Sequence, residues 1–397
     1  MPDIKSQTAD EARERFREWG QPEYRVSQLL EWLYVHRVCD WDAMTNLPKA
    51  LREQLRSHYS LHCVELVRKQ GSRDTTQKFL WRLADHSLIE SVLIPANPAL
   101  YGEPSDRHTL CVSTQVGCAY GCGFCASGLE GWKRNLNVEE IIEQVLGVER
   151  WNVKQGSGLQ VEDRGRTEDS SGADKAVRGP DAEGARIALP ASERLVTNLV
   201  IMGMGEPLAN YDNLMKALRI LNAPWGAGIG ARKITISTSG LAPQIRKLAD
   251  ESLQFRLAIS LHGATDETRG KIMPVNRKYP LRELTAACEY YQAKRGRMIT
   301  FEYILISGVN DGLDQIKPLA ALARKLNAKV NLIPYNAVEG LAWKRPSEEQ
   351  QESFLRALEA QGVTATLRLE KGHDIDAACG QLRLKTEREL EGATRVT

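Results

Sequence analysis

The 397-residue sequence lacks a long hydrophobic run and carries little excess of either charge. No apolar segment approaches the ~18 residues of a membrane-spanning helix, and the polar start MPDIKSQTADEARERF lacks the apolar core of a signal peptide. The net charge is +2, with 26% charged and 42% hydrophobic residues, which is the composition of an ordinary soluble globular protein. We therefore expect a cytoplasmic protein without a membrane partner, and the overall charge gives no sign of a nucleic-acid partner.

Cysteine is also scarce, with eight residues in all, and it is unevenly placed. Four of the eight lie between Cys111 and Cys125. Such clustering fits ligand or catalytic thiols in a reducing compartment better than a disulfide scaffold. Cys39, Cys63 and Cys288 lie in amphipathic or strand-like contexts, so we expect these three to be ordinary core residues.

Three of the clustered cysteines, Cys118, Cys122 and Cys125, have the spacing C-x3-C-x2-C within a glycine-rich loop. Three such thiolates can hold three corners of a cubane iron–sulfur cluster and leave the fourth iron open to another ligand. Structural zinc is the alternative, but it usually takes four ligands as two separated pairs, and no second pair follows here. The loop resembles the signature of radical S-adenosylmethionine (SAM) enzymes, so we favour a cluster.

The order of predicted elements indicates an α/β protein. Apolar periodicity predicts helices within about residues 8–59, and residues 61–95 have the alternation typical of strands. From His108 onward strands alternate with helices, which predicts a parallel sheet in a full or partial (β/α) barrel, with a doubly wound sheet as the alternative. The expected strands of this sheet are HTLCVSTQV, LVTNLVIM, KITIST, FRLAISL, MITFEYILI, KVNLIP and VTATLRL.

One segment interrupts this alternation. Residues 152–193 are rich in Gly, Ser, Asp and Arg and show no apolar period, which predicts a disordered surface insertion. We expect a helical accessory domain at 1–60, a β-rich connection at 61–103, a core at 104–372 that contains the insertion, and a C-terminal segment at 373–397.

Polar or small residues recur where the predicted strands end. A barrel of this type builds its active site from the loops at the C-terminal ends of its strands. Gly205 allows close backbone approach, Glu206 can accept hydrogen bonds from the SAM ammonium group, and the other side chains can bind carboxylate, ribose and adenine. Singly, each residue is more often a turn or a helix cap, so their recurrence at one end of the strands is what favours a site. The predicted SAM contacts are Gly205, Glu206, Ser237, Ser260, Leu261, His262 and Asn336.

Three further residues are candidates for covalent and proton-transfer chemistry. Cys111 lies at the end of the first predicted barrel strand, and Cys379 lies in DIDAACGQL beyond the last one. A nucleophilic thiol must be partly exposed and activated, and taken alone Cys379 is as readily a buried core residue. Glu90, in LIESVLIP, is a weaker candidate, because a glutamate on a strand more often faces water.

Six motifs occur in the order of a known family: CVSTQVGCAYGCGFCASGLEGWKRNL, GMGEPL, STSG, ISLHG, NLIPYN and DIDAACGQL. With them the chain closely resembles the RlmN/Cfr family of radical SAM RNA methyltransferases. The resemblance covers nearly the whole chain, and only the insertion at 152–193 departs from it. It implies a partial (β/α)6 radical SAM barrel with a helical N-terminal accessory domain and a small β extension.

The resemblance also implies a mechanism with a [4Fe-4S] cluster on the three loop cysteines and two SAM molecules per turnover. Cys379 takes a methyl group from the first SAM and becomes S-methylcysteine. The reduced cluster cleaves the second SAM to a 5′-deoxyadenosyl radical, which removes hydrogen from that methyl group, and the resulting carbon radical adds to an adenine ring carbon. Cys111 then attacks the sulfur of Cys379, which releases the RNA and leaves a transient disulfide, while Glu90 accepts the ring proton.

Two alternatives remain open at the level of the sequence. Within the family the product is adenine methylated at carbon 2 in 23S rRNA and tRNA, or at carbon 8 in 23S rRNA, and we favour carbon 2 as the more widespread activity. Carbon 2 is electron-poor and cannot attack the methyl group of SAM, whereas a carbon radical can add to it. The expected partners are these RNAs, with the adenine unstacked, and an electron donor such as flavodoxin or ferredoxin. A noncatalytic, zinc-stapled RNA-binding module is the alternative from another class.

Overall fold

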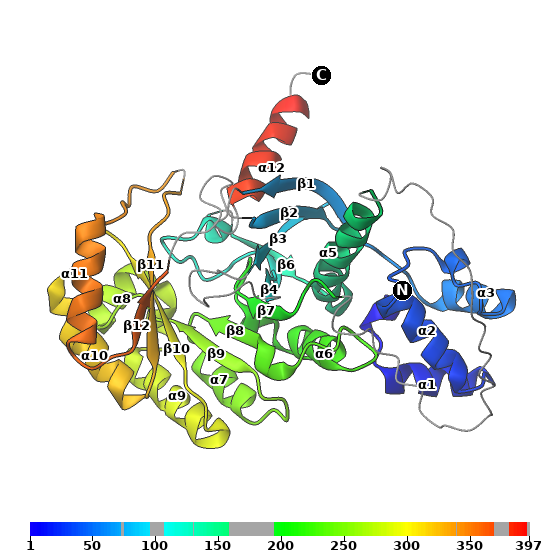
Figure 1. Cartoon of the computed structure of the whole chain (residues 1–397), viewed down its shortest axis with the longest axis horizontal. Coiled ribbons are helices and arrows are strands. Elements are labelled where there is room, and N and C mark those ends of the chain that lie inside the picture. The colour runs from blue at the N-terminus through cyan, green and yellow to red at the C-terminus, as the bar shows by residue number, and fades with distance from the viewer. Residues whose placement is uncertain are drawn as a thin grey trace, which may run out of the picture.

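A single mixed sheet of ten strands runs through the part of the chain that the structure describes (Figure 1). The structure is a computed structural model, and it describes residues 1–72, 75–95, 107–129, 131–158, 194–338, 340–368 and 381–394. Cys379 lies outside these ranges, as does most of the predicted insertion.

Seven of the ten strands form the parallel part of the sheet, and each pairs in parallel with its neighbours. Their spatial order follows their order in the chain without reversal. Right-handed crossovers between parallel strands in such an order place all the connecting helices on one side, whereas a doubly wound sheet requires a reversal. The predicted partial barrel is therefore confirmed. Its strands are β4 (His108–Cys111), β7 (Asn198–Ile201), β8 (Ile234–Thr238), β9 (Arg256–Ser260), β10 (Thr300–Leu305), β11 (Lys329–Pro334) and β12 (Ala365–Leu367).

The helices that cover this sheet begin and end at recognisable signals. Glu140 caps the first one by accepting the N–H of Asn137 at 2.8 Å, as the Asn-x-x-Glu pattern predicts. Gly296, with φ of 59°, ends another in the left-handed conformation. No helix in the described ranges combines the length and the apolar character that a bilayer crossing requires. The helices are α5 (Val138–Gly158), α6 (Tyr211–Asn222), α7 (Ala242–Ala249), α8 (Asp266–Ile272), α9 (Leu281–Arg295), α10 (Ile316–Lys325) and α11 (Glu348–Glu359).

An antiparallel extension continues the sheet beyond β4. It consists of β1 (Glu65–Gly71), β2 (Gln77–Arg82) and β3 (Leu88–Pro95), and β3 pairs with β4 so that Val92 lies opposite Cys111. A separate two-stranded ribbon, β5 (Gln115–Gly117) with β6 (Trp132–Asn135), encloses the cysteine loop. The short β6 was not predicted from the sequence, because a four-residue strand carries too few alternations to be recognised.

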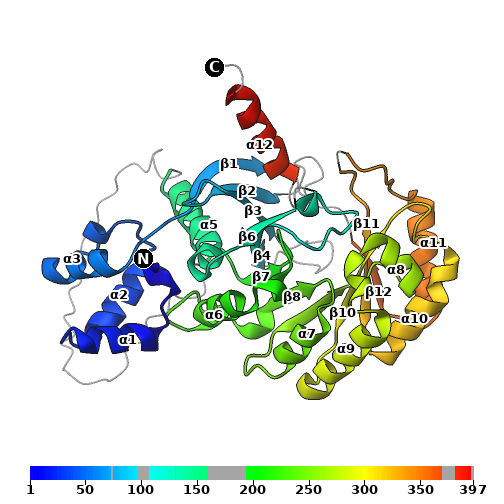
Figure 2. The same cartoon turned by 180° about the vertical axis from the view of Figure 1, so that it is seen from behind.

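The N-terminal residues form a helical module beside α5 and α6 (Figures 1 and 2). The first helix begins with a capping box in which Thr8 and Glu11 bond reciprocally to each other's backbone N–H groups. Apolar side chains at i, i+3 and i+4 spacing face inward, among them Leu29 and Leu33. The helices are α1 (Ala9–Glu18), α2 (Tyr24–Tyr34) and α3 (Lys49–His58).

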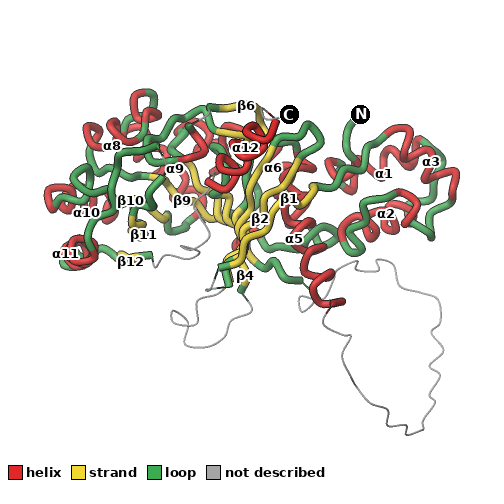
Figure 3. The backbone as a smooth tube through the Cα atoms, turned by 90° about the horizontal axis from the view of Figure 1, so that it is seen from above, coloured by secondary structure: helices red, strands yellow, loops and turns green. Residues whose placement is uncertain are grey.

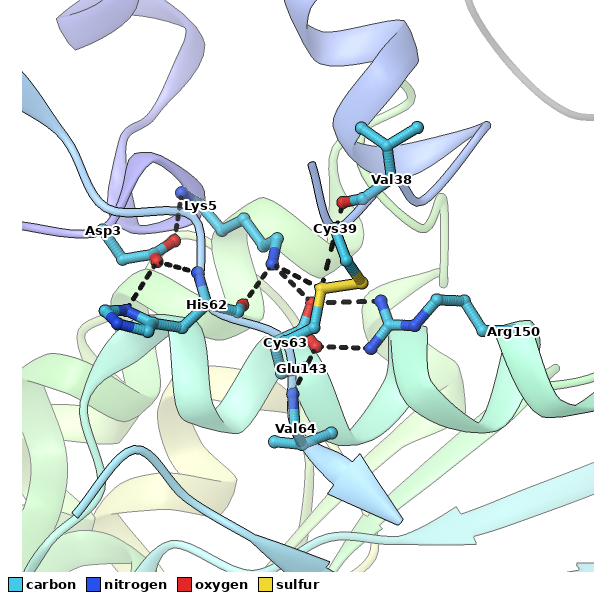
Figure 4. Close-up of a disulfide and its surroundings, with 9 residues drawn as sticks. All are labelled: Asp3, Lys5, Val38, Cys39, His62, Cys63, Val64, Glu143 and Arg150. Atoms are coloured by element: carbon cyan, nitrogen blue, oxygen red, sulfur yellow. Dashed lines mark hydrogen bonds and ion pairs between the residues drawn. A yellow bond between two sulfur atoms is a disulfide. The ribbon is translucent and has the colours of Figure 1, made fainter. Parts of the chain in front are cut away.

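A disulfide joins Cys39 to Cys63, so the prediction that both are ordinary core residues is wrong (Figure 4). The two residues are 24 apart in sequence, and their Cα atoms lie 5.8 Å apart. The chain reverses through α3 and brings the loop after α2 beside the segment that enters β1, a pairing that cysteine spacing alone does not reveal. For Cys288 the prediction is confirmed, because this residue of α9 is fully buried.

A buried charge cluster surrounds the disulfide and reaches into α5 (Figure 4). The Lys5 ammonium group lies 2.7 Å from the Glu143 carboxylate and 3.5 Å from the sulfur of Cys63. Glu143 also pairs with Arg150 at 2.5 Å and accepts the N–H of Val64 at 3.0 Å. One carboxylate of α5 thereby holds the start of the chain and the entry to β1.

The last described helix, α12 (Gln381–Thr394), begins against the β extension and projects away from it toward the C-terminus (Figure 1; Figure 3 gives the view from above). Its Leu382 is fully buried in a small apolar cluster with Leu80 and Leu88. The helix also contacts the 3-10 turn Ala126–Gly128, which directly follows the cysteine loop. The C-terminal helix is therefore packed against two elements that border the predicted site.

Candidate active site

A cavity of about 350 Å³ opens where the parallel strands end. This volume falls within the ~300–1,000 Å³ that is usual for small-molecule and cofactor sites. Six parallel strands and the segments that follow them each contribute to its lining. The contributing residues include Cys111, Glu206, Ser237, Ser260, Glu302 and Asn336.

The three loop cysteines Cys118, Cys122 and Cys125 line this cavity together. Burial, reinforced by the neighbouring Cys125, raises the pKa of Cys118 to about 12, and burial with both other thiols raises the pKa of Cys122 well above its ordinary value. Three crowded, half-buried thiols therefore need a cationic partner before they can be thiolates, and bound iron supplies one.

The donor set of three thiols in one loop fits a cubane cluster, which leaves one iron open to another ligand. One zinc ion would need all its ligands at about 2.0–2.3 Å, whereas in a cubane cluster each thiolate binds a different iron. The loop curls as the cluster requires, with Gly117 and Gly121 both at positive φ.

Gly205 and Glu206 follow β7 and lie beside the cysteine loop. Gly205 has φ of 99°, and a Cβ there would come within 2.5 Å of the Gln115 side chain. Gln115 in turn accepts the N–H of Glu206 at 2.8 Å. The Glu206 carboxylate, whose pKa burial raises, accepts the N–H groups of Leu208 and Ser239. These bonds fix a carboxylate at the cavity wall, where a cationic ligand group can meet it.

His262 lies against the cysteine loop with its ring perpendicular to that of Phe124, at 4.7 Å between centroids. Its Nδ1 accepts the N–H of Ile304 at 3.0 Å. Burial, with the nearby Arg269, lowers the pKa of His262 to about 3. The ring is therefore neutral and carries its proton on Nε2, which makes it a fixed hydrogen-bond donor.

The other predicted SAM contacts differ in what they offer. The hydroxyl oxygens of Ser237 and Ser260 lie 3.5 Å apart at the cavity wall. Leu261 is buried, its N–H donates to the Glu302 carbonyl at 3.0 Å, and its side chain is not part of the lining. The side-chain oxygen of Asn336 is buried at the cavity without a hydrogen-bond partner in the described structure, so it is open to a ligand donor.

The predicted chemical residues are only partly brought together. Cys111 ends β4 and lines the same cavity as the three loop cysteines. Glu90 is 2% exposed rather than facing water, and it pairs with Lys78 at 3.1 Å while accepting the N–H of Arg383 at 2.6 Å. It borders the start of α12, which begins two residues after Cys379 in the sequence, and Cys379 itself lies outside the described residues.

Two residues of the site were missed by sequence reasoning. Arg269 of α8 is fully buried beside Cys122 and donates to Asn276 at 2.7 Å and to the Ser239 carbonyl. A charged residue on a helix reads as exposed, so no sequence signal identified it. Glu302 of β10 lines the cavity and accepts a hydrogen bond from Asn331 at 2.7 Å. Because Glu302 is the charged residue of the otherwise mostly apolar strand TFEYIL, the sequence could have identified it as a candidate site residue.

Two family models match the chain. The "Ribosomal RNA large subunit methyltransferase N-terminal domain" matches residues 3–61, and the "Radical SAM superfamily" matches residues 171–320. The first range corresponds to the helical module, and the second lies C-terminal to the cysteine loop.

Similar proteins match over almost the full length. A probable dual-specificity RNA methyltransferase RlmN 3 of Opitutus terrae is 52% identical over 98% of this chain and 96% of that one. A probable dual-specificity RNA methyltransferase RlmN of Akkermansia muciniphila is 48% identical over 99% of both. Among solved structures, a radical SAM methyltransferase from Sphaerobacter thermophilus aligns with a TM-score of 0.80 at 41% identity, over 96% of this chain and 99% of that one.

Proposed function

Because the chain belongs to the RlmN family of radical SAM RNA methyltransferases, we propose that it methylates carbon 2 of adenine in 23S rRNA and in tRNA. The observation that carries the proposal is that Cys111 and the three C-x3-C-x2-C thiols line one cavity at the ends of the parallel strands. A radical SAM enzyme that only cleaves SAM needs the three loop cysteines. A fourth thiol at the same cavity supports release of a product by thiol exchange.

Each part of the cavity has a role in this proposal. Cys118, Cys122 and Cys125 hold the [4Fe-4S] cluster, which when bound supplies the electron that cleaves SAM. The neutral Nε2–H of His262 and the open oxygen of Asn336 provide one donor and one acceptor for SAM. The remaining proposed contacts are Gly205, Glu206, Ser237, Ser260 and the backbone of Leu261.

Two SAM molecules serve each turnover in the proposed sequence. Cys379 takes the methyl group of the first, which leaves as S-adenosylhomocysteine, and becomes S-methylcysteine. The methyl group then loses one hydrogen atom to the adenosyl group of the second SAM, which leaves as 5′-deoxyadenosine and methionine, and the methylene carbon bonds to the adenine. The adduct then gives up one electron, which the cluster would take back, and the ring carbon gives its proton to Glu90. Cys111 bonds to the sulfur of Cys379, the electron pair of the broken sulfur–carbon bond stays with the methylene carbon, and that carbon takes up a proton to become the methyl group. The disulfide that remains is reduced by a dithiol, and an electron donor such as flavodoxin or ferredoxin serves the cluster.

The test is product analysis with anaerobically reconstituted protein. We would measure the iron and sulfide content and the cleavage of SAM under reduction. Methylated nucleosides from digested 23S rRNA and tRNA would be identified by mass spectrometry against 2-methyl- and 8-methyladenosine standards. We expect 2-methyladenosine in both RNAs. Only 8-methyladenosine would overturn the carbon assignment, and zinc without iron, together with no SAM cleavage, would overturn the enzyme itself.

A further inference from the structure

Lys78 and Glu90 form a buried ion pair in the β extension, next to the proposed site. Their side chains are 0% and 2% exposed, and the ammonium nitrogen lies 3.1 Å from Oε2 of the carboxylate. In the β2–β3 register Leu80 lies opposite Glu90, so Lys78 reaches Glu90 diagonally on the same face. Two charges removed from water need close geometry and further hydrogen bonds, which suggests that this pair is retained for more than stability.

The second oxygen of Glu90 holds the start of α12. Oε1 accepts the N–H of Arg383, the third residue of that helix, at 2.6 Å. The first N–H groups of a helix have no partner within it, and the helix dipole favours a negative charge at that end. Glu90 therefore spans two buried positive partners, the Lys78 ammonium group and the amino end of a helix.

The amino end of α12 is fixed by side chains as well. Leu382 packs against Leu80 and Leu88, and the fully buried Arg383 pairs with Glu387 one turn further on at 2.5 Å. In the sequence α12 begins two residues after Cys379. The carboxylate that we assign as proton acceptor is thus also the anchor of the helix that follows the methyl-accepting thiol.

We propose that Lys78 is a positioning residue of the reaction, which balances the charge of the buried Glu90 carboxylate and orients it so that it can accept the ring proton while it caps α12. This inference rests on the proposed role of Glu90. Lys78 itself does not react: its charge balances that of Glu90 until the carboxylate accepts the ring proton. The proposal therefore adds no covalent step.

Replacement of the ammonium group should leave the Glu90 carboxylate buried without its counter-ion. A buried carboxylate without its counter-ion protonates more readily, and once protonated it cannot accept a further proton. Its carbonyl oxygen can still accept the N–H of Arg383, so the helix cap remains. Among the described residues, the charged and titratable side chains around Glu90 include Lys78 from β2, Arg383 and Glu387 from α12, Lys133 of β6 through its 3.7 Å pair with Glu387, and Cys111 from β4.

The experiment compares Lys78→Met and Lys78→Arg in the full-length, cluster-loaded enzyme. Methylation of Cys379 is measured by intact protein mass, and the covalent RNA adduct is measured on denaturing gels. The rate of product release is measured as a function of pH. With Lys78→Met we expect Cys379 to be methylated, adduct to accumulate and release to slow about 100-fold at neutral pH, with recovery as the pH rises. Lys78→Arg, which keeps the charge, should restore most of the release rate.

Lys5 provides a matched control, because its pair with Glu143 has the same burial, 0% and 2%, and neither residue lines the cavity. Lys5→Met should lower stability without accumulating adduct or shifting the pH profile. Wild-type release and an unshifted pH profile in Lys78→Met would overturn the inference, as would equal adduct accumulation in Lys5→Met.

A double variant keeps the inference testable if Lys78→Met does not fold. Lys78→Met with Glu90→Gln removes both charges of the pair, and the Gln amide oxygen can accept the Arg383 N–H. If Lys78 acts only through Glu90, the double variant should release product at the rate of Glu90→Gln alone, whereas a further loss would contradict the inference. Failure of the proposed function is distinguishable, because it would appear in the wild type as no methylation of Cys379 or of RNA.

Discussion

At the scale of single residues, Cys111 and Cys379 carry the sharpest chemical prediction. Cys111→Ala should trap the protein covalently on RNA through Cys379, because no thiol remains to attack the bridging sulfur. A protease-sensitive, slowly migrating RNA species on a denaturing gel measures the adduct. Cys288→Ala is the control, since that buried thiol of α9 lies away from the cavity lining. Normal turnover by Cys111→Ala would show that the two-cysteine mechanism does not operate here.

Gly205 shows how a backbone requirement can be tested separately from chemistry. In Gly205→Ala, a Cβ would meet Gln115 at 2.5 Å and displace the side chain that accepts the N–H of Glu206. With strain of about 1–3 kcal/mol localised there, we expect SAM to bind at least about tenfold more weakly, as measured by equilibrium dialysis.

The matched control for that variant is Gly296→Ala. Gly296 also has positive φ, at 59°, but a Cβ there would meet nothing within 4 Å. This variant should lose some stability at the end of α9 and bind SAM normally. Equal loss of SAM binding in both variants would mean that positive φ alone, rather than the contact with Gln115, accounts for the effect.

At the scale of elements, the disulfide is the feature whose contribution can be measured most directly. It closes a loop with a sequence separation of 24 residues that contains all of α3. By the chain-entropy relation, such a closure stabilises the folded state by about 3 kcal/mol. We expect the double variant Cys39→Ser, Cys63→Ser to lower the free energy of unfolding by about this amount in denaturant titrations under non-reducing conditions.

Reduction of the Cys39–Cys63 disulfide in the wild-type protein tests the same prediction. Wild-type protein in excess dithiol should fall to the stability of the double variant, while the double variant should not respond to the dithiol. A wild type that is indifferent to reduction would indicate that the N-terminal module is held by packing and by the Lys5 cluster alone.

The elements also show what sequence reasoning could and could not supply. Strong alternation and caps located the strands from β7 to β12, and the Asn137–Glu140 signal located the start of α5. The Cys39–Cys63 bond and the Lys78–Glu90 pair were missed. Each joins residues that the fold of the chain brings together, and local periodicity in the sequence does not indicate such pairs. A strand glutamate such as Glu90 reads as solvent-facing until the helix that covers it is placed.

The same limit applies within the candidate site. The cluster cysteines and the strand-end residues follow from motif spacing and from the rule that barrel sites lie at the ends of parallel strands. Arg269 and Gln115 act through other residues, by a buried guanidinium group beside Cys122 and by a bond to the backbone of Glu206. Gln115 lies within the motif CVSTQVGC without an assigned role and Arg269 belongs to no quoted motif, so only the folded structure reveals what these side chains do.

At the scale of the whole molecule, the helical module is joined to the barrel by charges as much as by apolar packing. Lys216 of α6 reaches Glu11 of α1 at 2.7 Å, and Tyr34 of α2 meets Trp225 edge to face at 5.5 Å. The most buried link is Glu143 of α5, which holds Lys5, Arg150 and the backbone of Val64 (Figure 4). Module and barrel should therefore unfold together.

Glu143→Gln tests that coupling. The variant leaves Lys5 buried without its counter-ion, which costs about 3–5 kcal/mol, and calorimetry should then show the module melting before the barrel. Asp212→Asn, which breaks the exposed pair with Lys247 at 2.8 Å, is the control and should change little. A single unshifted transition in Glu143→Gln would show that packing alone couples the two parts.

The pH dependence of this link has a definite sign. Burial raises the pKa of Glu143, but Lys5 and Arg150 outweigh it and hold that pKa below its ordinary value of 4.5. Because the unfolded carboxyl binds its proton more readily than the folded one, the stabilisation is complete above pH 4.5 and is lost as the pH falls through the folded pKa. The stability difference between wild type and Glu143→Gln should therefore be constant near neutral pH and shrink in acid. A difference that grew as the pH fell would mean that Glu143 is not held as a carboxylate in the folded protein.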